Sequence, residues 1–157
     1  MTWGEPSLIL AALLVALLLA CGIEDARLRT IANWKNAAIA LLAPLWWWAN
    51  GLALWPDVAL QLGIAAIVFA LFVGAFALGQ MGGGDVKMLG AIALWFPFAP
   101  LLKLLMVMAI IGGILTVAVM IERRMRKLTG PVEIPYGVAI AIAGLLAVRE
   151  PLFNQFT

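Results

Sequence analysis

This chain of 157 residues contains no histidine, one cysteine, Cys21, and one tyrosine, Tyr136. A Ser/His/Asp triad and a catalytic Cys/His pair both need an imidazole ring, so both are excluded. A single cysteine rules out a disulfide bond within the chain, and the lack of histidine argues against a Cys/His metal site. Acid–base chemistry is therefore left to Asp, Glu, Lys, Tyr or water, and we expect neither a metal ion nor another cofactor.

Charged residues are also scarce, at 11% of the chain, whereas 66% of the residues are hydrophobic. With a mean hydropathy of +1.11, the chain has too little polar surface to cover a water-soluble globule. The net charge of +2 does not indicate a nucleic-acid partner, because the cations lie in loops between apolar runs and report topology. We expect a single integral-membrane domain over residues 1–157, in contact with the lipid bilayer.

Six apolar runs, several of them short for a full crossing, follow one another along the chain. They predict an all-α membrane protein, a six-helix transmembrane bundle. The block Trp46-Trp47-Trp48 is typical of an interfacial anchor, because indole rings favour the headgroup zone. Arg27 and Arg29 follow the first run and no Lys or Arg precedes it, which is the reverse of a cleaved signal peptide. The predicted segments are about 7–23, 37–55, 58–78, 86–100, 102–121 and 134–149.

The distribution of cations between the runs predicts the orientation. Lys and Arg concentrate in the connectors after the first, third and fifth runs, and only Lys103 and Arg149 lie elsewhere. By the positive-inside rule these three connectors are cytoplasmic and both termini are outside. Eight of the ten Lys and Arg residues follow those three runs: Arg27, Arg29, Lys35, Lys87, Arg123, Arg124, Arg126 and Lys127.

This orientation places Asp25, after the first run, and Asp85, before the fourth, on the same membrane face. A carboxylate near membrane depth costs roughly 2.5 to 3.5 kcal/mol unless it is paired or hydrated, which marks such a residue as a functional candidate. Asp85 also suits an ordinary helix N-cap in a glycine turn. Asp25 follows a helix C-terminus, where the helix dipole disfavours an anion unless Arg27 or Arg29 compensates. A functional pair and a structural ion pair both remain open at this point.

Two adjacent carboxylates suit peptide hydrolysis, because like charges cannot both ionise cheaply and the pair holds one shared proton. One group takes a proton from water, and the other hydrogen-bonds the developing oxyanion. The glycines Gly82, Gly83 and Gly84 leave room for a substrate strand beside Asp85. Lys87 either lowers the pKa values of the pair, meets a substrate carboxylate, or simply extends to the membrane surface.

Three motifs carry a resemblance to a known family. The run Gly82-Gly83-Gly84-Asp85 fits the Gly-x-Gly-Asp signature of intramembrane aspartic proteases, and its continuation to Lys87 resembles the type IV prepilin leader peptidases. The segment 25–33 is similar to that family's first catalytic segment, although Ala32 stands where the family usually has proline. Residues 134–139 resemble the opening of its last helix, with Pro135 in the first turn and Tyr136 at the interface.

The resemblance implies that Asp25 and Asp85 are catalytic and face the cytoplasm. It implies a prepilin substrate with a short basic leader and an apolar helix, cut at the cytoplasmic face of a bacterial inner membrane. The cysteine-rich insertion of the larger members is absent, which is typical of the compact branch that serves Flp (tight-adherence) pili. The alternative is a non-enzymatic transporter, proton carrier or pilus assembly subunit. The residues expected to bind substrate or support the site are Gly82, Gly83, Gly84, Lys87, Arg29, Asn33, Pro135 and Tyr136.

Overall fold

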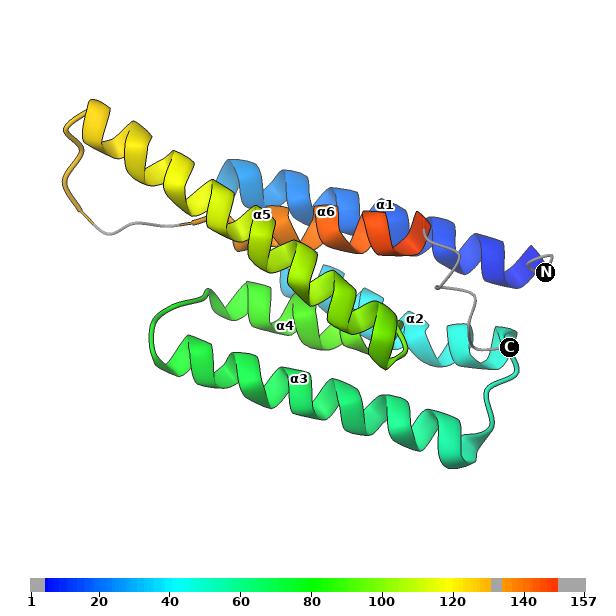
Figure 1. The fold of residues 1–157 in the computed structure, drawn as a ribbon. Coiled ribbons are helices and arrows are strands. Elements are labelled where there is room, and N and C mark those ends of the chain that lie inside the picture. The colour runs from blue at the N-terminus through cyan, green and yellow to red at the C-terminus, as the bar shows by residue number, and fades with distance from the viewer. Residues whose placement is uncertain (1–4, 131–133, 150–157) are drawn as a thin grey trace.

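The computed structural model describes residues 5–130 and 134–149, and every regular element in these residues is helical (Figure 1). The predicted all-α class and the expected six α-helices are confirmed. Three helical segments, Glu5–Leu28, Leu54–Ala77 and Phe98–Met125, are long and apolar enough to cross a membrane. The helices are α1 (Glu5–Leu28), α2 (Asn33–Ala49), the short π-helical turn η1 (Leu54–Val58), α3 (Ala59–Ala77), α4 (Gly83–Ala93), α5 (Phe98–Met125) and α6 (Tyr136–Arg149).

Successive helices run in opposite directions. The last turns of α1, α3 and α5 and the first turns of α2, α4 and α6 therefore lie toward one end of the bundle, at the left of Figure 1. The eight cations counted above belong to these turns and the connectors beside them. We refer to this end of the bundle as the cation-rich end.

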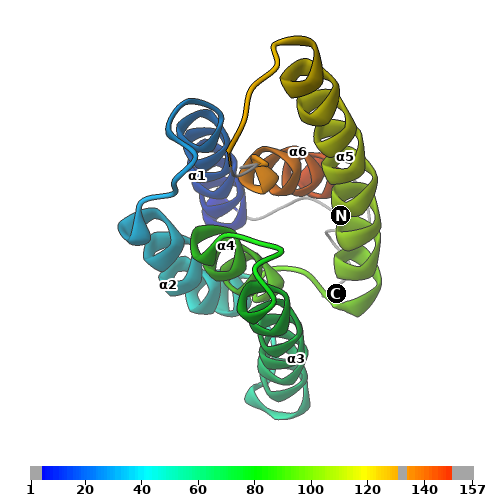
Figure 2. The ribbon, with the colours of Figure 1, turned by 90° about the vertical axis from the view of Figure 1, so that its left-hand side faces the viewer.

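Helix α4 occupies the centre of the bundle, where it packs against α2, α3 and α6 (Figure 2). Helix α6 in turn packs against α1 and α5. Because α4 has only 11 residues, its length of roughly 16 Å covers about half of a hydrocarbon core about 30 Å thick. The central helix therefore ends inside the protein, and its last carbonyl groups need partners there.

Side chains of α2 and α3 supply these partners. Trp47 Nε1 donates a hydrogen bond to the carbonyl oxygen of Leu94 at 2.8 Å. Gln61 Nε2 donates to the carbonyl oxygens of Ala93 and Phe96 at 2.7 and 2.6 Å. A helix end without such donors is costly where water is excluded. The buried Gln61 and Trp47 thus allow α4 to stop halfway across the bundle.

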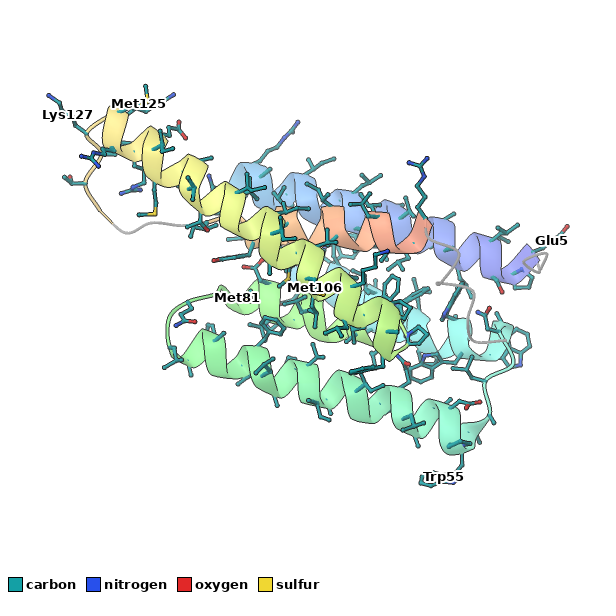
Figure 3. The ribbon with its side chains drawn as sticks, viewed as in Figure 1. Glu5, Trp55, Met81, Met106, Met125 and Lys127 are labelled. Carbon is teal, nitrogen blue, oxygen red and sulfur yellow. The ribbon has the colours of Figure 1, made fainter. Side chains whose placement is uncertain are left out.

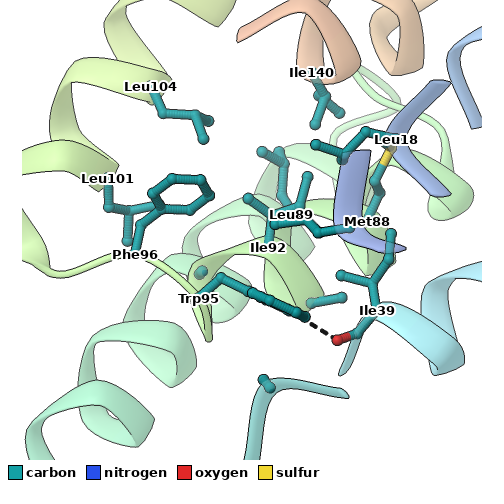
Figure 4. Packing of buried hydrophobic residues seen from close by; sticks show 14 of the residues in the cluster. Leu18, Ile39, Met88, Leu89, Ile92, Trp95, Phe96, Leu101, Leu104 and Ile140 are labelled. Carbon is teal, nitrogen blue, oxygen red and sulfur yellow. Dashed lines mark hydrogen bonds between the residues drawn. The ribbon is translucent and has the colours of Figure 1, made fainter. Parts of the chain in front are cut away.

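The tryptophan block does not form the predicted interfacial anchor. Trp46 is fully buried, Trp47 is 7% exposed, and only Trp48, at 77%, faces outward. The ring of Trp46 packs against that of Trp95, with 5.5 Å between ring centroids. Trp95 donates to the carbonyl oxygen of Ile39 at 2.8 Å (Figure 4). The anchor prediction is wrong for Trp46 and Trp47: the early end of α4 requires a buried donor for the Leu94 carbonyl, which the Trp47 indole supplies, while the Trp46 ring packs in the core against Trp95.

The fourth helix also differs from its predicted range of 86–100. It begins at Gly83, within the glycine cluster, and ends at Ala93. Pro97 precedes the first residue of α5, and Pro100 lies in the first turn of that helix. Proline is tolerated in a first turn because the N–H groups there have no helical partner. Pro100 therefore belongs to the start of α5 and not to the end of α4.

Candidate active site

Asp25 and Asp85 line the same cavity, of about 310 Å³, at the cation-rich end. Asp25 lies in the last turn of α1 and Asp85 in the first turn of α4, and their exposed fractions are 4% and 7%. Met81, from the loop between α3 and α4, borders this cavity, which we call the acid cavity (Figure 3). Its other lining residues are Arg29, Gly79, Gln80, Gly82, Ile134 and Tyr136.

The two carboxyl groups converge on the first turn of α6. The N–H of Val138 donates a hydrogen bond to Oδ2 of Asp25 at 3.2 Å, and the N–H of Gly137 interacts with the carboxyl groups of both Asp25 and Asp85. The first N–H groups of a helix have no partner within it and carry partial positive charge, so they favour anions. The amino end of α6 therefore offsets the unfavourable position of Asp25 near the carboxyl end of α1.

Gly137 was missed as a site residue at the level of sequence. A Cβ atom at this position would lie 2.8 Å from Cγ and Oδ2 of Asp25 and from Cδ1 of Ile31. Only glycine lets the carboxyl group approach the helix this closely. The signal was a glycine in the first turn of an apolar helix, directly after Pro135-Tyr136.

Asp85 is not an N-cap. Gly82 holds the N-cap position of α4 and Asp85 is the third helical residue, whose carboxyl group accepts a hydrogen bond from the N–H of Gly82. This is half of the capping-box arrangement, in which an acidic side chain reaches back to the capping residue. The carboxyl group thereby turns toward the acid cavity at the mouth of the helix.

Burial, and after it the charge of Asp25, raises the pKa of Asp85 to about 7, although the N–H groups of Gly82 and Gly137 act in the opposite direction. Asp85 lies outside the three helical segments that are long enough to cross a membrane. A raised pKa is expected for one member of a close carboxyl pair that has little access to water. Near neutral pH, a substantial fraction of Asp85 therefore carries a proton.

The three glycines before Asp85 have different surroundings. Gly82 lines the acid cavity, and a Cβ atom there would lie 3.1 Å from Oδ2 of Asp85. Gly83 faces the ring of Phe76 instead, and Gly84 packs against Ile31. The carbonyl oxygen of Gly84 also accepts a hydrogen bond from Asn36 at 3.1 Å. Of the three, only Gly82 offers backbone beside the two acids.

Lys87 and Asn33 lie apart from the acids. Lys87 Nζ donates to Oδ1 of Asn33 at 2.9 Å, which joins α4 to the first turn of α2. Both residues line a second cavity, of about 550 Å³, between α2, α3 and α4. Lys87 is thus brought together with Asn33 and not with the carboxyl pair. Its predicted supporting role stays a prediction.

The remaining candidates lie at or beside the acid cavity. Arg29 and Tyr136 line it. The ring of Tyr136 also packs against α5, since a Cβ atom at Gly112 would lie 3.0 Å from its Cε1 atom. Pro135 is buried directly before α6 and accepts a hydrogen bond from the N–H of Val138 at 3.2 Å. Ala32, at the position usually held by proline, has φ −62° and ψ 130°, values that proline also adopts.

The chemistry available to this arrangement is acid–base catalysis. Two buried carboxyl groups face one cavity large enough for water and a peptide backbone, and backbone N–H groups favour a negative charge beside them. Among residues 5–130 and 134–149, no group of three His, Cys, Asp or Glu side chains is placed to hold a metal ion.

The model of the type IV leader peptidase family matches residues 12–117, about two thirds of the chain, and this match includes Asp25 and Asp85. The chain belongs to the type IV leader peptidase family. It is accordingly a protease and, with three helices able to cross a bilayer, a membrane protein. Comparisons with curated proteins and with solved structures gave no match. In this leader peptidase, the family match ends before α6, the helix whose first N–H groups meet the acids.

Proposed function

We propose that this leader peptidase is an aspartic endopeptidase that removes the short basic leader of Flp-type prepilins, with Asp25 and Asp85 as its catalytic pair. The observation that carries the proposal is the convergence of two buried carboxyl groups on one cavity and on one backbone N–H, that of Gly137. Like charges this close favour a single shared proton. A pKa of about 7 for Asp85 is in keeping with such sharing near neutral pH.

In the proposed reaction, the ionised carboxyl group takes a proton from a water molecule as the water oxygen attacks the scissile carbonyl carbon. The protonated carboxyl group hydrogen-bonds the carbonyl oxygen, where negative charge develops. When the tetrahedral intermediate collapses, the C–N bond breaks and the amine nitrogen takes up a proton from the pair. The products are the leader with a new carboxyl group and the mature pilin with a new amino terminus.

The location of the acids supports cleavage at the cytoplasmic face of the inner membrane. Both lie at the cation-rich end, and positively charged connectors remain in the cytoplasm. The direct test uses Lys103→Cys and Lys127→Cys variants, because Lys103 and Lys127 are exposed and the native Cys21 is buried. A membrane-impermeant maleimide added to intact spheroplasts should label position 103 and leave position 127 unlabelled. The reverse pattern would contradict this orientation.

The proposed preference for an Flp-type precursor rests on the short connector between α1 and α2. The described chain passes from α1 to α2 in four residues, 29–32, which leaves no room there for a cysteine-rich insertion. The test reconstitutes the purified chain in liposomes with equal amounts of an Flp-type prepilin and an archaeal preflagellin-type precursor. Faster release of the Flp-type leader is expected. Equal or slower release would overturn the preference, and release of neither leader would overturn the peptidase assignment.

A non-enzymatic role, as a transporter, a proton carrier or a pilus assembly subunit, is the second candidate. A transport path for ions or protons usually needs ionisable groups near mid-membrane. The two acids instead lie together at one end, and α3 contains no Asp, Glu, Lys or Arg. This arrangement favours the peptidase.

A further inference from the structure

Glu24, the residue before Asp25, ties the end of α1 to the start of α2. Its Oε2 atom accepts a hydrogen bond from the N–H of Ala32 at 2.9 Å and forms an ion pair with Lys35 Nζ at 2.9 Å. Lys35 Nζ also donates to the carbonyl oxygen of Ala20 at 3.3 Å. We call the two contacts of Glu24, with the N–H of Ala32 and with Lys35, the connector clamp. It closes a connector that begins only four residues after the catalytic Asp25.

Both ends of this connector have defined backbone geometry. Arg29 has φ +56°, a left-handed conformation that reverses the chain after α1, and its N–H donates to the carbonyl oxygen of Asp25 at 3.0 Å. Ala32 has φ −62° and ψ 130° and precedes the first residue of α2. Ala32 has no side chain that could hold this conformation. Two hydrogen bonds restrain its backbone: the N–H of Ala32 donates to Oε2 of Glu24, and the carbonyl oxygen of Ala32 accepts from the N–H of Lys35 at 3.1 Å. Of the two, only the first involves a side chain.

Ile31, between these two ends, separates the helix turns that carry the site. It is 8% exposed. A Cβ atom at Gly84 would lie 3.4 Å from Ile31 Cβ, and one at Gly137 would lie 2.8 Å from Ile31 Cδ1. Ile31 therefore packs between the first turn of α4, which carries Asp85, and the first turn of α6, whose N–H groups meet both acids.

We infer that Glu24 is a positioning residue of the peptidase: through the N–H of Ala32 it holds Ile31 between α4 and α6 and so sets the separation of the two carboxyl groups. The inference rests on the proposed function of Asp25 and Asp85. It assigns Glu24 no contact with substrate. Its effect passes through backbone geometry, from Ala32 to Ile31 and then to the two helix turns.

The connector clamp differs from an ordinary surface ion pair. The side chains of Lys35 and Glu24 are only 13% and 20% exposed, whereas those of Arg126 and Glu122, which pair at 3.2 Å at the same end, are 68% and 56% exposed. Exposed pairs contribute little to stability. Glu122→Ala is therefore the matched control for loss of a carboxylate and its ion pair.

The first test measures kcat and KM for prepilin cleavage by the full chain in liposomes. Glu24→Ala should lower kcat on the order of 10- to 100-fold, because small displacements of reacting groups have effects of this size. KM should stay within about 3-fold, because no substrate contact is lost. Glu24→Gln retains an oxygen acceptor for the N–H of Ala32 and should recover most of kcat. Wild-type kcat in Glu24→Ala, or a Glu24→Gln variant as slow as Glu24→Ala, would overturn the inference.

The second test is rescue. Proline fixes φ near −65°, close to the φ of −62° at Ala32, without needing a hydrogen bond. The double variant Glu24→Ala/Ala32→Pro should therefore regain kcat to within about 3-fold of wild type. If the double variant cleaves no faster than Glu24→Ala, Glu24 does not act through Ala32 and the inference is overturned. A loss of stability alone would also lower the yield of folded protein, so kcat is referred to the folded fraction.

The outcomes for the inference and for the proposed function are separable. Cleavage by an Asp25→Asn variant in the same liposomes would overturn the proposed function, whatever the Glu24 variants do. With Asp25→Asn inactive and Glu122→Ala at wild-type rate, failed rescue would overturn the connector clamp alone.

Discussion

The N–H of Val138 donates a hydrogen bond to Oδ2 of Asp25 across 113 positions of sequence, at 3.2 Å. This contact joins the end of the first helix to the start of the last one. It is possible because the neighbouring residue, Gly137, has no Cβ atom to separate the carboxyl group from the helix. The last helix thus takes part in the site through its backbone.

Gly137→Ala is expected to disable the peptidase without unfolding it. The added Cβ atom would lie 2.8 Å from Cγ of Asp25, so the carboxyl group must move, and displacement of a reacting group by about 1 Å costs on the order of 100-fold in rate. The control is Gly113→Ala in α5, where nothing lies within 4 Å of the added atom. Leader-cleavage rates per folded molecule should fall only for Gly137→Ala. Equal rates for the two variants would show that the approach to Gly137 is unimportant.

The raised pKa of Asp85 predicts a pH-dependent stability penalty. The folded protein holds the Asp85 proton up to about pH 7, while the unfolded chain releases it near the ordinary value of 3.8. Between these values the folded state binds more protons, so stability falls as the pH rises. Asp85→Asn removes this penalty. The variant should be more stable than wild type at about pH 8 and lose that advantage toward about pH 4. Thermal unfolding in detergent at the two pH values tests this, and a pH-independent difference would contradict it.

The buried indole of Trp47 is expected to stabilise the end of α4. Trp47→Phe removes the donor to the Leu94 carbonyl oxygen, a bond of 2.8 Å. A buried acceptor left unsatisfied costs about 1 to 3 kcal/mol of unfolding free energy. Trp48→Phe, at a position that is 77% exposed, is the control and should change it by less than about 0.5 kcal/mol. Unfolding titrations of both variants in mixed micelles provide the comparison. Equal losses of unfolding free energy would contradict a stabilising role for the Trp47 indole at the end of α4.

Chelators are expected to leave leader cleavage unchanged. In the described parts of the chain, no three acidic, cysteine or histidine side chains are grouped as metal ligands. The measurement compares the cleavage rate of purified enzyme before and after treatment with EDTA and re-addition of Mg²⁺ or Zn²⁺. A loss restored by either metal would contradict an unassisted carboxyl pair.

The meeting of Asp25 and Asp85 in one cavity could be anticipated because charge counting requires no knowledge of packing. Lys and Arg concentrate after alternate apolar runs, so both acids had to lie toward the same end. The all-α class and the number of helices could likewise be predicted without knowledge of packing, from the six apolar runs of the sequence.

The features that were not anticipated depend on tertiary contacts. The roles of Trp46 and Trp47 follow from where α4 stops, and the composition of α2 carries no sign of this. The glycine cluster was expected to serve substrate as a unit, yet Gly83 and Gly84 pack against Phe76 and Ile31. The N–H groups at the start of α6 belong to the backbone, so Gly137 after Pro135-Tyr136 is a weak signal for them, and their contact with Asp25 becomes visible only in the folded chain.

The most direct test of a catalytic carboxyl pair is leader cleavage by Asp25→Asn and Asp85→Asn, reconstituted in liposomes and confirmed as folded. Asparagine preserves the size of each side chain and removes its acid–base function. Asp57→Asn is the matched control, because Asp57 is exposed before α3 and lines neither cavity described above. Both site variants should lose leader release by at least about 1,000-fold while Asp57→Asn keeps the wild-type rate. Cleavage near the wild-type rate by either folded site variant would contradict the account.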